Sequence, residues 1–306
     1  MNHSDATFEL IKELTQNEKR HFRVFSGTSG SDKNYLKVFD ALDKMKIYDN
    51  KTLNKKLAGT KINVSYEKNY LHKQLQKSLR TFYSENNSSI QLLDILKTIE
   101  ILYRKRLIAQ CQKLVDRGIG IVEKYELWNF HLELIEWQYR IYARSGNYKK
   151  LDLYEKEGLH EKKKLLETIG TYAAVQNEIY SMVLIANDRG IYIRKKLKDA
   201  CRKVIARCLP VLKKHETEFR IPELIYSTLY FAAHFSGDLK KAYHYSLSTY
   251  RLYNKYPHFK NDLPFKFFVA IGSLINRCIH LKKYEEGLGY ISELKLFVKH
   301  LPAFAT

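Results

Sequence analysis

The chain has 306 residues, of which 45% are hydrophobic, and carries a formal net charge of +20 at pH 7. That length can bury a sizeable core, and the hydrophobic content is ordinary for a folded protein. No run of about eighteen apolar residues indicates a membrane span. The polar, acidic start lacks the basic patch and apolar core of a signal peptide. We therefore expect a folded, cytoplasmic protein.

The composition favours long helices over short strands and turns. The chain contains only 5 prolines and 13 glycines, and it is rich in leucine, lysine, glutamate and tyrosine. Its four cysteines lie on apolar stripes of predicted helices, without a CxxC motif or a nearby pair of histidines. We expect them to be reduced thiols in the core, as is usual in a cytosolic protein. They are Cys111, Cys201, Cys208 and Cys278.

The strongest deviation from average composition is the charge. Lysine and arginine total 53 against 33 acidic residues, and the pI is about 9.5. Such a balance favours anionic partners, namely nucleic acid, acidic proteins or an anionic membrane surface. Surface lysine that keeps a helical protein soluble produces the same balance, and we give this interpretation slightly more weight.

Residues 1–85 are predicted to form a small helical domain. Apolar residues at three- and four-residue steps mark short helices within residues 1–25, 33–45 and 49–57. Thr15 followed by Glu18 is typical of a capping box, so a second helix should begin there. The glycine-containing loop at residues 26–31 does not match the spacing of a phosphate-binding loop, and we interpret it as a linker.

The last predicted helix of this domain, residues 65–83, has a basic face. Three short helices followed by a longer basic one resemble a helix-turn-helix arrangement. Lys73, Lys77 and Arg80 recur at four- and three-residue steps, which makes them the candidate nucleic-acid face. The start of the helix offers few side chains for reading base edges, so we favour a solvated face over a recognition helix.

Residues 90–306 are predicted to consist of helical hairpins. The polar stretch at 85–89 is the predicted domain boundary, and beyond it inter-helix turns are expected at intervals of 40, 44, 47 and 45 residues. A nearly constant period with a helix on each side of every turn is typical of an α-solenoid. The predicted turns lie at Arg106, Gly146, Gly190, Gly237 and Lys282. The predicted pairs are 90–105 with 107–125, 127–145 with 147–168, 172–189 with 192–214, 219–236 with 239–256, and 263–281 with 284–300.

The hairpin at residues 219–256 shows this pattern most clearly. Gly237 can adopt the left-handed conformation that closes a helix, and Asp238 can accept the first free N–H groups of the next helix. Pro257 is expected to end the second helix.

Two of these turns carry a family resemblance. The stretches ARSGNYKKL (residues 143–151) and HFSGDLKKAYHY (234–245) resemble the turn of tetratricopeptide repeats, with matching residues at Gly146, Tyr148, Gly237, Leu239 and Ala242. The family's tryptophan and its helix-ending proline are not cleanly present, and the period is longer than that of the family. The N-terminal stretches LTQNEKRHFRVF, SDKNYLKVFDAL and KNYLHKQLQKSLRTF also resemble uncharacterised bacterial helical-repeat proteins. This second resemblance covers most of the chain but implies no known activity. The tetratricopeptide resemblance implies a right-handed superhelix that binds other proteins.

No motif of a catalytic site, cofactor site or metal site is present, and the histidines are scattered. Glu133, Glu136 and Arg140 share one face of a predicted first helix. In an array of the tetratricopeptide type such a face lines the concave groove, so they are candidate groove residues. A solvated face of ion pairs at three- and four-residue spacing is the more favoured interpretation.

The densest basic segment is residues 189–214. Its candidate anion-binding residues lie outside the apolar stripe of a predicted helix, and no exposed aromatic residues alternate with them to stack on bases. They are Arg194, Lys195, Lys198, Arg202 and Lys203.

The predicted last helix, residues 284–300, has more apolar residues than one buried face requires. Leu288 and Ile291 are expected to face the neighbouring helix, whereas Tyr290, Leu296 and Leu301 fall partly outside that stripe. Since a solenoid needs a polar outer face on its terminal helix, we expect this helix to support self-association or to bind a partner.

The sequence therefore predicts an all-α protein, a right-handed α-solenoid of about five helical hairpins preceded by a small helical N-terminal domain. We expect a non-enzymatic scaffold that binds a protein or peptide and requires no cofactor. The alternative is a nucleic-acid-associated regulator that uses residues 1–85 and the basic segment at residues 189–214. An enzyme is a distant third hypothesis.

Overall fold

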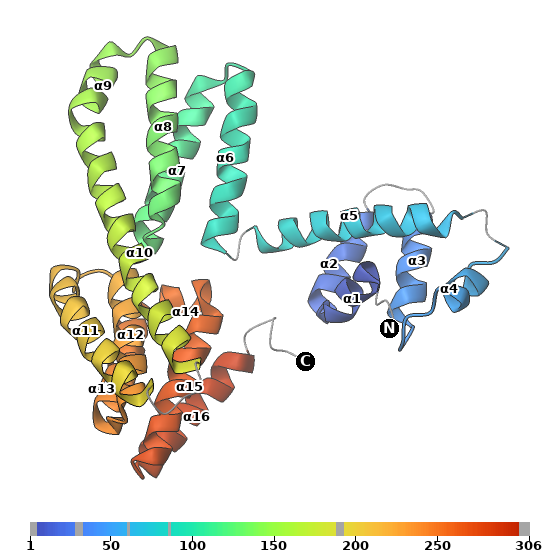
Figure 1. The fold of residues 1–306 in the computed structure, drawn as a ribbon. Helices are drawn as coiled ribbons and strands as arrows, with labels where there is room; N and C mark the ends of the chain where they lie inside the picture. The colour runs from blue at the N-terminus through green and yellow to red at the C-terminus, as the bar shows by residue number, and fades with distance from the viewer. Residues whose placement is uncertain (1–4, 28–32, 60–61, 85–86, 188–192, 300–306) are drawn as a thin grey trace. The chain divides into compact units, whose positions relative to one another are not determined.

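The computed structural model describes residues 5–27, 33–59, 62–84, 87–187 and 193–299, with only the backbone at 185–187 and 193–196. Every regular element in these ranges is helical, which confirms the all-α prediction (Figure 1). No helix in the same ranges combines the length and apolarity that a bilayer crossing needs. The chain divides into two compact units, one containing the chain up to Asn86 and the other Asn87–Phe297.

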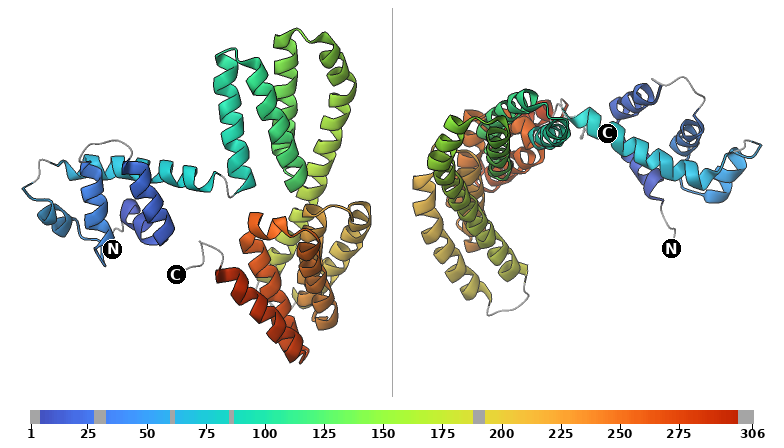
Figure 2. Two further views of the ribbon diagram at one scale, coloured as in Figure 1. Left: turned by 180° about the vertical axis from the view of Figure 1, so that it is seen from behind. Right: turned by 90° about the horizontal axis from the view of Figure 1, so that it is seen from above.

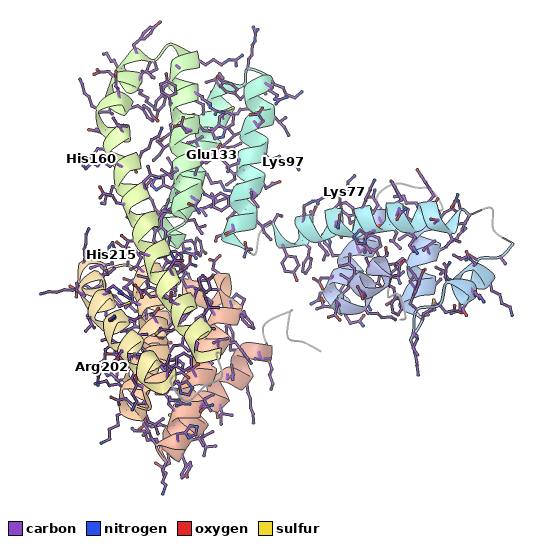
Figure 3. The ribbon with its side chains drawn as sticks, viewed as in Figure 1. Lys77, Lys97, Glu133, His160, Arg202 and His215 are labelled. Atoms are coloured by element: carbon purple, nitrogen blue, oxygen red, sulfur yellow. The ribbon has the colours of Figure 1, made fainter. Side chains whose placement is uncertain are left out.

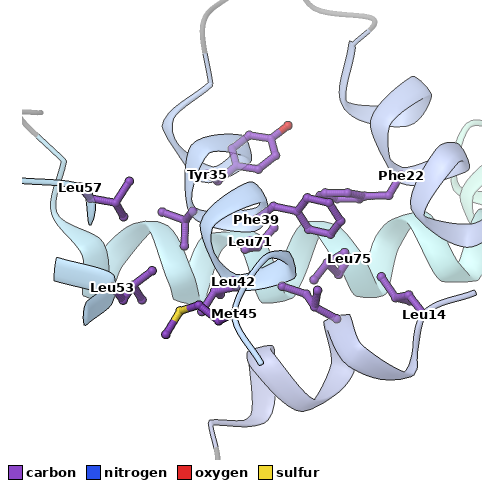
Figure 4. Close-up of a cluster of buried hydrophobic side chains, with 12 residues drawn as sticks. Leu14, Phe22, Tyr35, Phe39, Leu42, Met45, Leu53, Leu57, Leu71 and Leu75 are labelled. Carbon is purple, nitrogen blue, oxygen red and sulfur yellow. The ribbon is translucent and has the colours of Figure 1, made fainter. Parts of the chain in front are cut away.

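The first unit is built around its longest helix, which packs against three of the other four. Its core is a cluster of buried side chains that includes Phe22, Phe39 and Leu42 from the short helices and Leu71 and Leu75 from the long one (Figure 4). The helices are α1 (Ala6–Glu13), α2 (Gln16–Gly27), α3 (Asn34–Asp43), α4 (Asn50–Lys56) and α5 (Val64–Tyr83).

The predicted capping box at the start of α2 is confirmed. The backbone N–H of Thr15 donates to Glu18 Oε2 at 2.7 Å, and the backbone N–H of Glu18 donates to Thr15 Oγ1 at 3.3 Å. The other carboxylate oxygen of Glu18 accepts a hydrogen bond from the hydroxyl of Tyr83 at 2.7 Å. The capping residue therefore also ties α2 to the end of α5.

The second unit begins with antiparallel neighbours joined by short turns. Arg106, Glu126 and Gly146 adopt left-handed backbone conformations between successive helices, as expected where a helix ends and the chain reverses. Two of these residues, Arg106 and Gly146, were predicted as turns. The helices are α6 (Ser88–Arg104), α7 (Ile108–Tyr125), α8 (Trp128–Ser145), α9 (Tyr148–Leu153) and α10 (Leu159–Asn187), with a π-helical turn at Tyr154–Gly158.

The predicted break between residues 168 and 172 is wrong. The π-helical turn links α9 to α10 without a reversal, and α10 continues through Gly170 to Asn187. Its buried side chains Leu165, Val175 and Met182 pack on both sides of the expected break, and this packing outweighs the weak helix propensity of one glycine. Figures 1 and 2 show α10 running through the second unit, where it contacts α8, α11 and α12. The predicted turn at Gly190 lies outside the described residues.

The rest of the unit contains the most regular hairpins. Gly237 has a φ of 79° at the end of α12, and Asp238 Oδ1 accepts the backbone N–H of Lys241 at 3.0 Å, so both predicted roles are confirmed. Lys282 also takes a left-handed conformation, at the predicted turn between the last two helices. The helices are α11 (Ile193–Lys214), α12 (Arg220–Ser236), α13 (Leu239–Lys255), α14 (His258–Asp262), α15 (Pro264–His280) and α16 (Tyr284–Lys299).

The last two hairpins keep one common register. Lys266 of α15 contacts Glu223 of α12, and Arg277 contacts His234, each across 43 residues. The second helices share this offset, because the hydroxyls of Tyr243 and Tyr250 donate to Glu286 and Glu293, again 43 residues away. The helix α12 therefore runs parallel to α15, and α13 runs parallel to α16, with the same offset of 43 residues in both pairs.

The expected orientation of α16 needs a correction. Leu288, expected to face the neighbouring helix, is 63% exposed. Gly287 faces α15 instead, and a Cβ there would lie 3.3 Å from Cys278 Cβ. This close approach rotates Tyr290, expected outside the stripe, to the buried side, where its ring lies 5.0 Å from that of Tyr250. Leu296 is exposed as expected, and Leu301 lies outside the described residues.

A polar junction joins the start of α6 to elements late in the second unit. Asp262 accepts hydrogen bonds from the backbone N–H and the hydroxyl of Ser88, 174 residues away, and pairs with Arg220 at 3.3 Å. Glu126 accepts the backbone N–H groups of Phe219 and Arg220, each at 2.6 Å. Burial raises the pKa of Glu126, although these two N–H groups favour its charged form. The four residues Ser88, Glu126, Arg220 and Asp262 are called the polar junction below.

Candidate functional site: a groove between α12 and α15

A cavity forms a groove between the parallel helices α12 and α15. Its volume is about 240 Å³, and α13 provides its floor. The lining residues are Ile179 of α10; Glu223, Leu224, Ser227, Tyr230 and Phe231 of α12; Ser246 and Thr249 of α13; and Phe265, Lys266, Val269, Ala270 and Ser273 of α15.

Small side chains on α13 keep the floor of the groove low. Ser246 and Thr249 are both buried there. Their hydroxyls donate to backbone carbonyls of the same helix, Tyr243 O at 2.9 Å and Tyr245 O at 3.0 Å. Because these hydroxyls are already bonded, the floor presents mainly carbon atoms to a ligand.

The walls of the groove hold apolar side chains that remain accessible. Phe265 is 66% exposed, and Val269, one turn along α15, is also exposed. Tyr230 and Phe231 form the opposite wall on α12, with their ring centroids 5.3 Å apart. Contiguous exposed apolar surface of this kind is typical of a binding site.

One ion pair lies in the groove. Lys266 Nζ is 2.8 Å from Glu223 Oε2, and the Glu223 side chain is almost completely buried. Burial alone would lower the pKa of Lys266, but the attraction of Glu223 and its hydrogen bond outweigh this effect, so the pKa is raised. Lys266 is therefore charged near neutral pH, and Glu223 is held in an ion pair rather than free to act as a general base.

The polar side chains of the groove do not form a recognisable catalytic arrangement. No serine or cysteine of its lining is hydrogen-bonded to a histidine, which is the arrangement that activates a nucleophile. Across the described ranges, no cluster of three or more histidine, cysteine or acidic residues could hold a metal ion. The volume is below the roughly 300–1,000 Å³ of most small-molecule sites, so the groove suits individual side chains of a docked segment better than a whole cofactor.

The candidate groove residues predicted on α8 do not line this cavity. Glu133 is exposed, and Glu136 forms an ion pair with Lys162 of α10 (Glu133 is labelled in Figure 3). The guanidinium of Arg140 lies over the ring of Trp137, 4.8 Å from its centroid. The ion pair of Glu136 thus reaches another helix and the partner of Arg140 is a ring, so neither contact is the ion pair at three- or four-residue spacing that the sequence favoured.

The candidate anion-binding residues on α11 are only partly described. The side chains of Arg194 and Lys195 lie outside the described part of the structure. Lys198, Arg202 and Lys203 are exposed, and Arg202 is 3.5 Å from Asp199 (Figure 3). Lys203 borders a wide cavity of about 600 Å³ between α10 and α11. That cavity also contains Glu178, which pairs with Arg207 at 2.6 Å, so acidic groups interrupt its positive charge.

The candidate nucleic-acid face on α5 is exposed along its length. Lys73, Lys77 and Arg80 all reach solvent (Figure 3). Tyr66, which is 65% exposed, and Tyr70, also exposed, continue the same stripe toward the start of the helix. The sequence analysis did not include these tyrosines in the stripe, although their three- and four-residue spacing relative to Lys73 and Lys77 was visible.

Sequence analysis also missed the groove between α12 and α15. A signal was present, since Glu223 and Lys266 occupy the starts of the first helices of two successive predicted hairpins. Comparison with known proteins gives no further guidance: no protein-family model, curated protein or solved structure matches this chain. The function has to be inferred from geometry alone.

Proposed function

We propose that this chain is a non-enzymatic scaffold that binds a segment of a partner protein in the groove between α12 and α15. The observation that carries the proposal is the groove itself, with accessible phenylalanine, valine and tyrosine side chains over a floor of small residues. An extended segment would place apolar side chains between these walls, and the charges of Glu223 and Lys266 would meet polar groups of its backbone or side chains.

The proposal includes a right-handed α-solenoid of the tetratricopeptide type for the second unit. It is supported by the common offset of 43 residues at four contacts between the last two hairpins, because repeated hairpins stack with one constant register. In such an array the first helices of successive hairpins, here α12 and α15, line the concave face.

The test is a pull-down from native cell extract at low and moderate salt, with a matched pair of variants. Ser227→Phe fills the groove, whereas Ser181→Phe adds the same side chain at an exposed position of α10 outside it. We expect a protein that resists moderate salt and is retained by the wild type and Ser181→Phe but lost from Ser227→Phe. Equal retention by both variants would contradict binding in the groove.

The α5 stripe supports a second candidate function, binding of nucleic acid by the first unit. Its basic residues can contact phosphates, and the exposed Tyr66 and Tyr70 can stack on unpaired bases. The test is fluorescence anisotropy with labelled single-stranded nucleic acid over a range of salt. We expect the triple change of Lys73, Lys77 and Arg80 to Glu to weaken binding.

The matched control for this test is the triple change of three exposed lysines on α4 to Glu, which alters the charge of the same unit equally. The α4 variant should keep most of the affinity if the stripe is the site. Equal losses from both variants would instead assign binding to net charge. The α4 lysines are Lys51, Lys55 and Lys56.

A further inference from the structure

Arg277 of α15 is buried, and no acidic side chain in the described part of the chain pairs with it. The residue as a whole is only 4% exposed. Its Nη2 donates to Asn276 Oδ1 at 2.8 Å, and its Nη1 lies 3.4 Å from His234 Nδ1. Its Nε is buried and has no hydrogen-bond partner. Because buried charges are normally paired with an opposite charge, this guanidinium lacks a counter-ion.

Two other cations of the unit do have acidic partners. Arg220 pairs with Asp262 and donates to Tyr125 O at 2.7 Å. Lys266 lies on the same helix as Arg277 and meets α12 at the same offset, where it finds Glu223. Eleven positions further on, that register brings a histidine to Arg277 where an acid would be expected.

The surroundings of the pair are positive as well. Burial lowers the pKa of His234, and the charges of Arg277 and His280 lower it further. The C-terminal ends of α12 and α15 favour nearby cations. However, no backbone carbonyl of the described residues accepts a hydrogen bond from Arg277, so the helix ends do not satisfy its N–H groups.

We infer that Arg277 and His234 form a binding site for an oxyanion, either a carboxylate or a phosphate group. The free Nε and a neighbouring Nη of a guanidinium form a planar fork that matches two oxygens of such a group. Tyr230 and Ser273, each four residues before a member of the pair, line the end of the groove cavity. The pair therefore lies one helical turn beyond that end of the cavity. Neither Arg277 nor His234 lines the cavity, so the anion site stands or falls independently of peptide binding in the groove.

The first test is thermal unfolding at pH 7 and constant ionic strength, with sodium phosphate replacing sodium chloride. We expect phosphate to raise the Tm of the wild type by about 2 °C or more, since a bound ligand stabilises the folded state. Arg277→Met removes the guanidinium and should abolish this shift. The control Arg251→Met removes an exposed charge on α13 and should keep it. An equal shift in all three proteins, or none in the wild type with any oxyanion, would overturn the proposal.

His234→Glu is the second, independent variant, because it supplies the missing counter-ion within the chain. The substitution places a carboxylate opposite Arg277 in the way that Glu223 lies opposite Lys266, at the same offset of 43 residues. We expect a higher Tm than the wild type without phosphate and no further rise when phosphate is added. If this variant responds to phosphate as the wild type does, Arg277 is not the binding group and the proposal fails, even if Arg277→Met does not fold.

The chemical source of the oxyanion follows from a comparison of two ligands at equal concentration. N-acetylglutamate represents an acidic side chain of a polypeptide, and inorganic phosphate represents a phosphoryl group. A larger Tm shift with one of them, lost in Arg277→Met, supports the site and identifies the class of ligand. A shift from either ligand that persists in Arg277→Met and His234→Glu would count against the site.

Discussion

Replacing Gly118 by alanine tests the close approach of α7 and α8. A Cβ at Gly118 would lie 2.9 Å from Leu134 Cδ1 and 3.0 Å from Cδ2, and Leu134 is fully buried. Alanine in a helix is favoured over glycine by about 1 kcal/mol, whereas overpacking a well-filled core costs about 1–3 kcal/mol. We expect Gly118→Ala to leave the free energy of unfolding unchanged or to lower it by about 2 kcal/mol.

Gly120, two residues along the same helix, is the matched control. A Cβ there meets no atom within 4 Å, so Gly120→Ala gains the helix propensity alone and should stabilise the protein by about 1 kcal/mol. Urea unfolding followed by circular dichroism measures both variants, and the two should differ by about 1–3 kcal/mol. Equal stabilisation by both substitutions would refute the described packing of α7 on α8.

Three further predictions follow from other parts of the molecule. Tyr253→Phe removes a fully buried hydroxyl without a hydrogen-bond partner and should leave stability unchanged or raise it. Tyr250→Phe breaks the hydrogen bond to Glu293 and should lower the free energy of unfolding in urea by about 1 kcal/mol. A larger loss for Tyr253→Phe than for Tyr250→Phe would contradict this expectation. Burial raises the pKa of Glu126, so the native state binds its proton more tightly than the unfolded state does. The stability of the wild type relative to Glu126→Gln should therefore fall as the pH rises from about 4.3 through the folded pKa. A rise in relative stability over that pH range would contradict the burial of this carboxyl. Leu288 and Leu296 are exposed on α16, and if this face supports self-association, their joint change to Glu should convert a dimer to a monomer in light scattering, whereas a wild type that is already monomeric would exclude that role.

Features that depend on neighbours in sequence could be predicted from the sequence. The capping box of Thr15 and Glu18 and the reversal at Gly237 and Asp238 involve only residues a few positions apart. Their side-chain and backbone preferences are strong enough to act without tertiary help. The all-α class could be predicted for the same reason, because helical periodicity is a local signal.

Features that depend on distant partners could not be predicted. The chain continues as a helix through Gly170 because buried residues on both sides of it pack against other helices. The orientation of α16 is set by the contact of Gly287 with Cys278, which no periodicity reveals. The groove and the anion site have the same limitation, because the pairing of Lys266 with Glu223 and the lack of a counter-ion at Arg277 become visible only when the register of α12 against α15 is known.

The polar junction has a consequence for how the second unit unfolds. In an open array of repeats, each hairpin contacts only its neighbours, so stability is a sum over adjacent pairs and the ends fray first. Here Ser88, at the start of α6, donates two hydrogen bonds to Asp262, which also forms an ion pair with Arg220. Detaching α6 would leave the buried Asp262 without two of its hydrogen bonds, a cost that falls on elements late in the chain. The unit should therefore lose its structure in one cooperative step, and a shortened chain without α6 should be destabilised far from the cut.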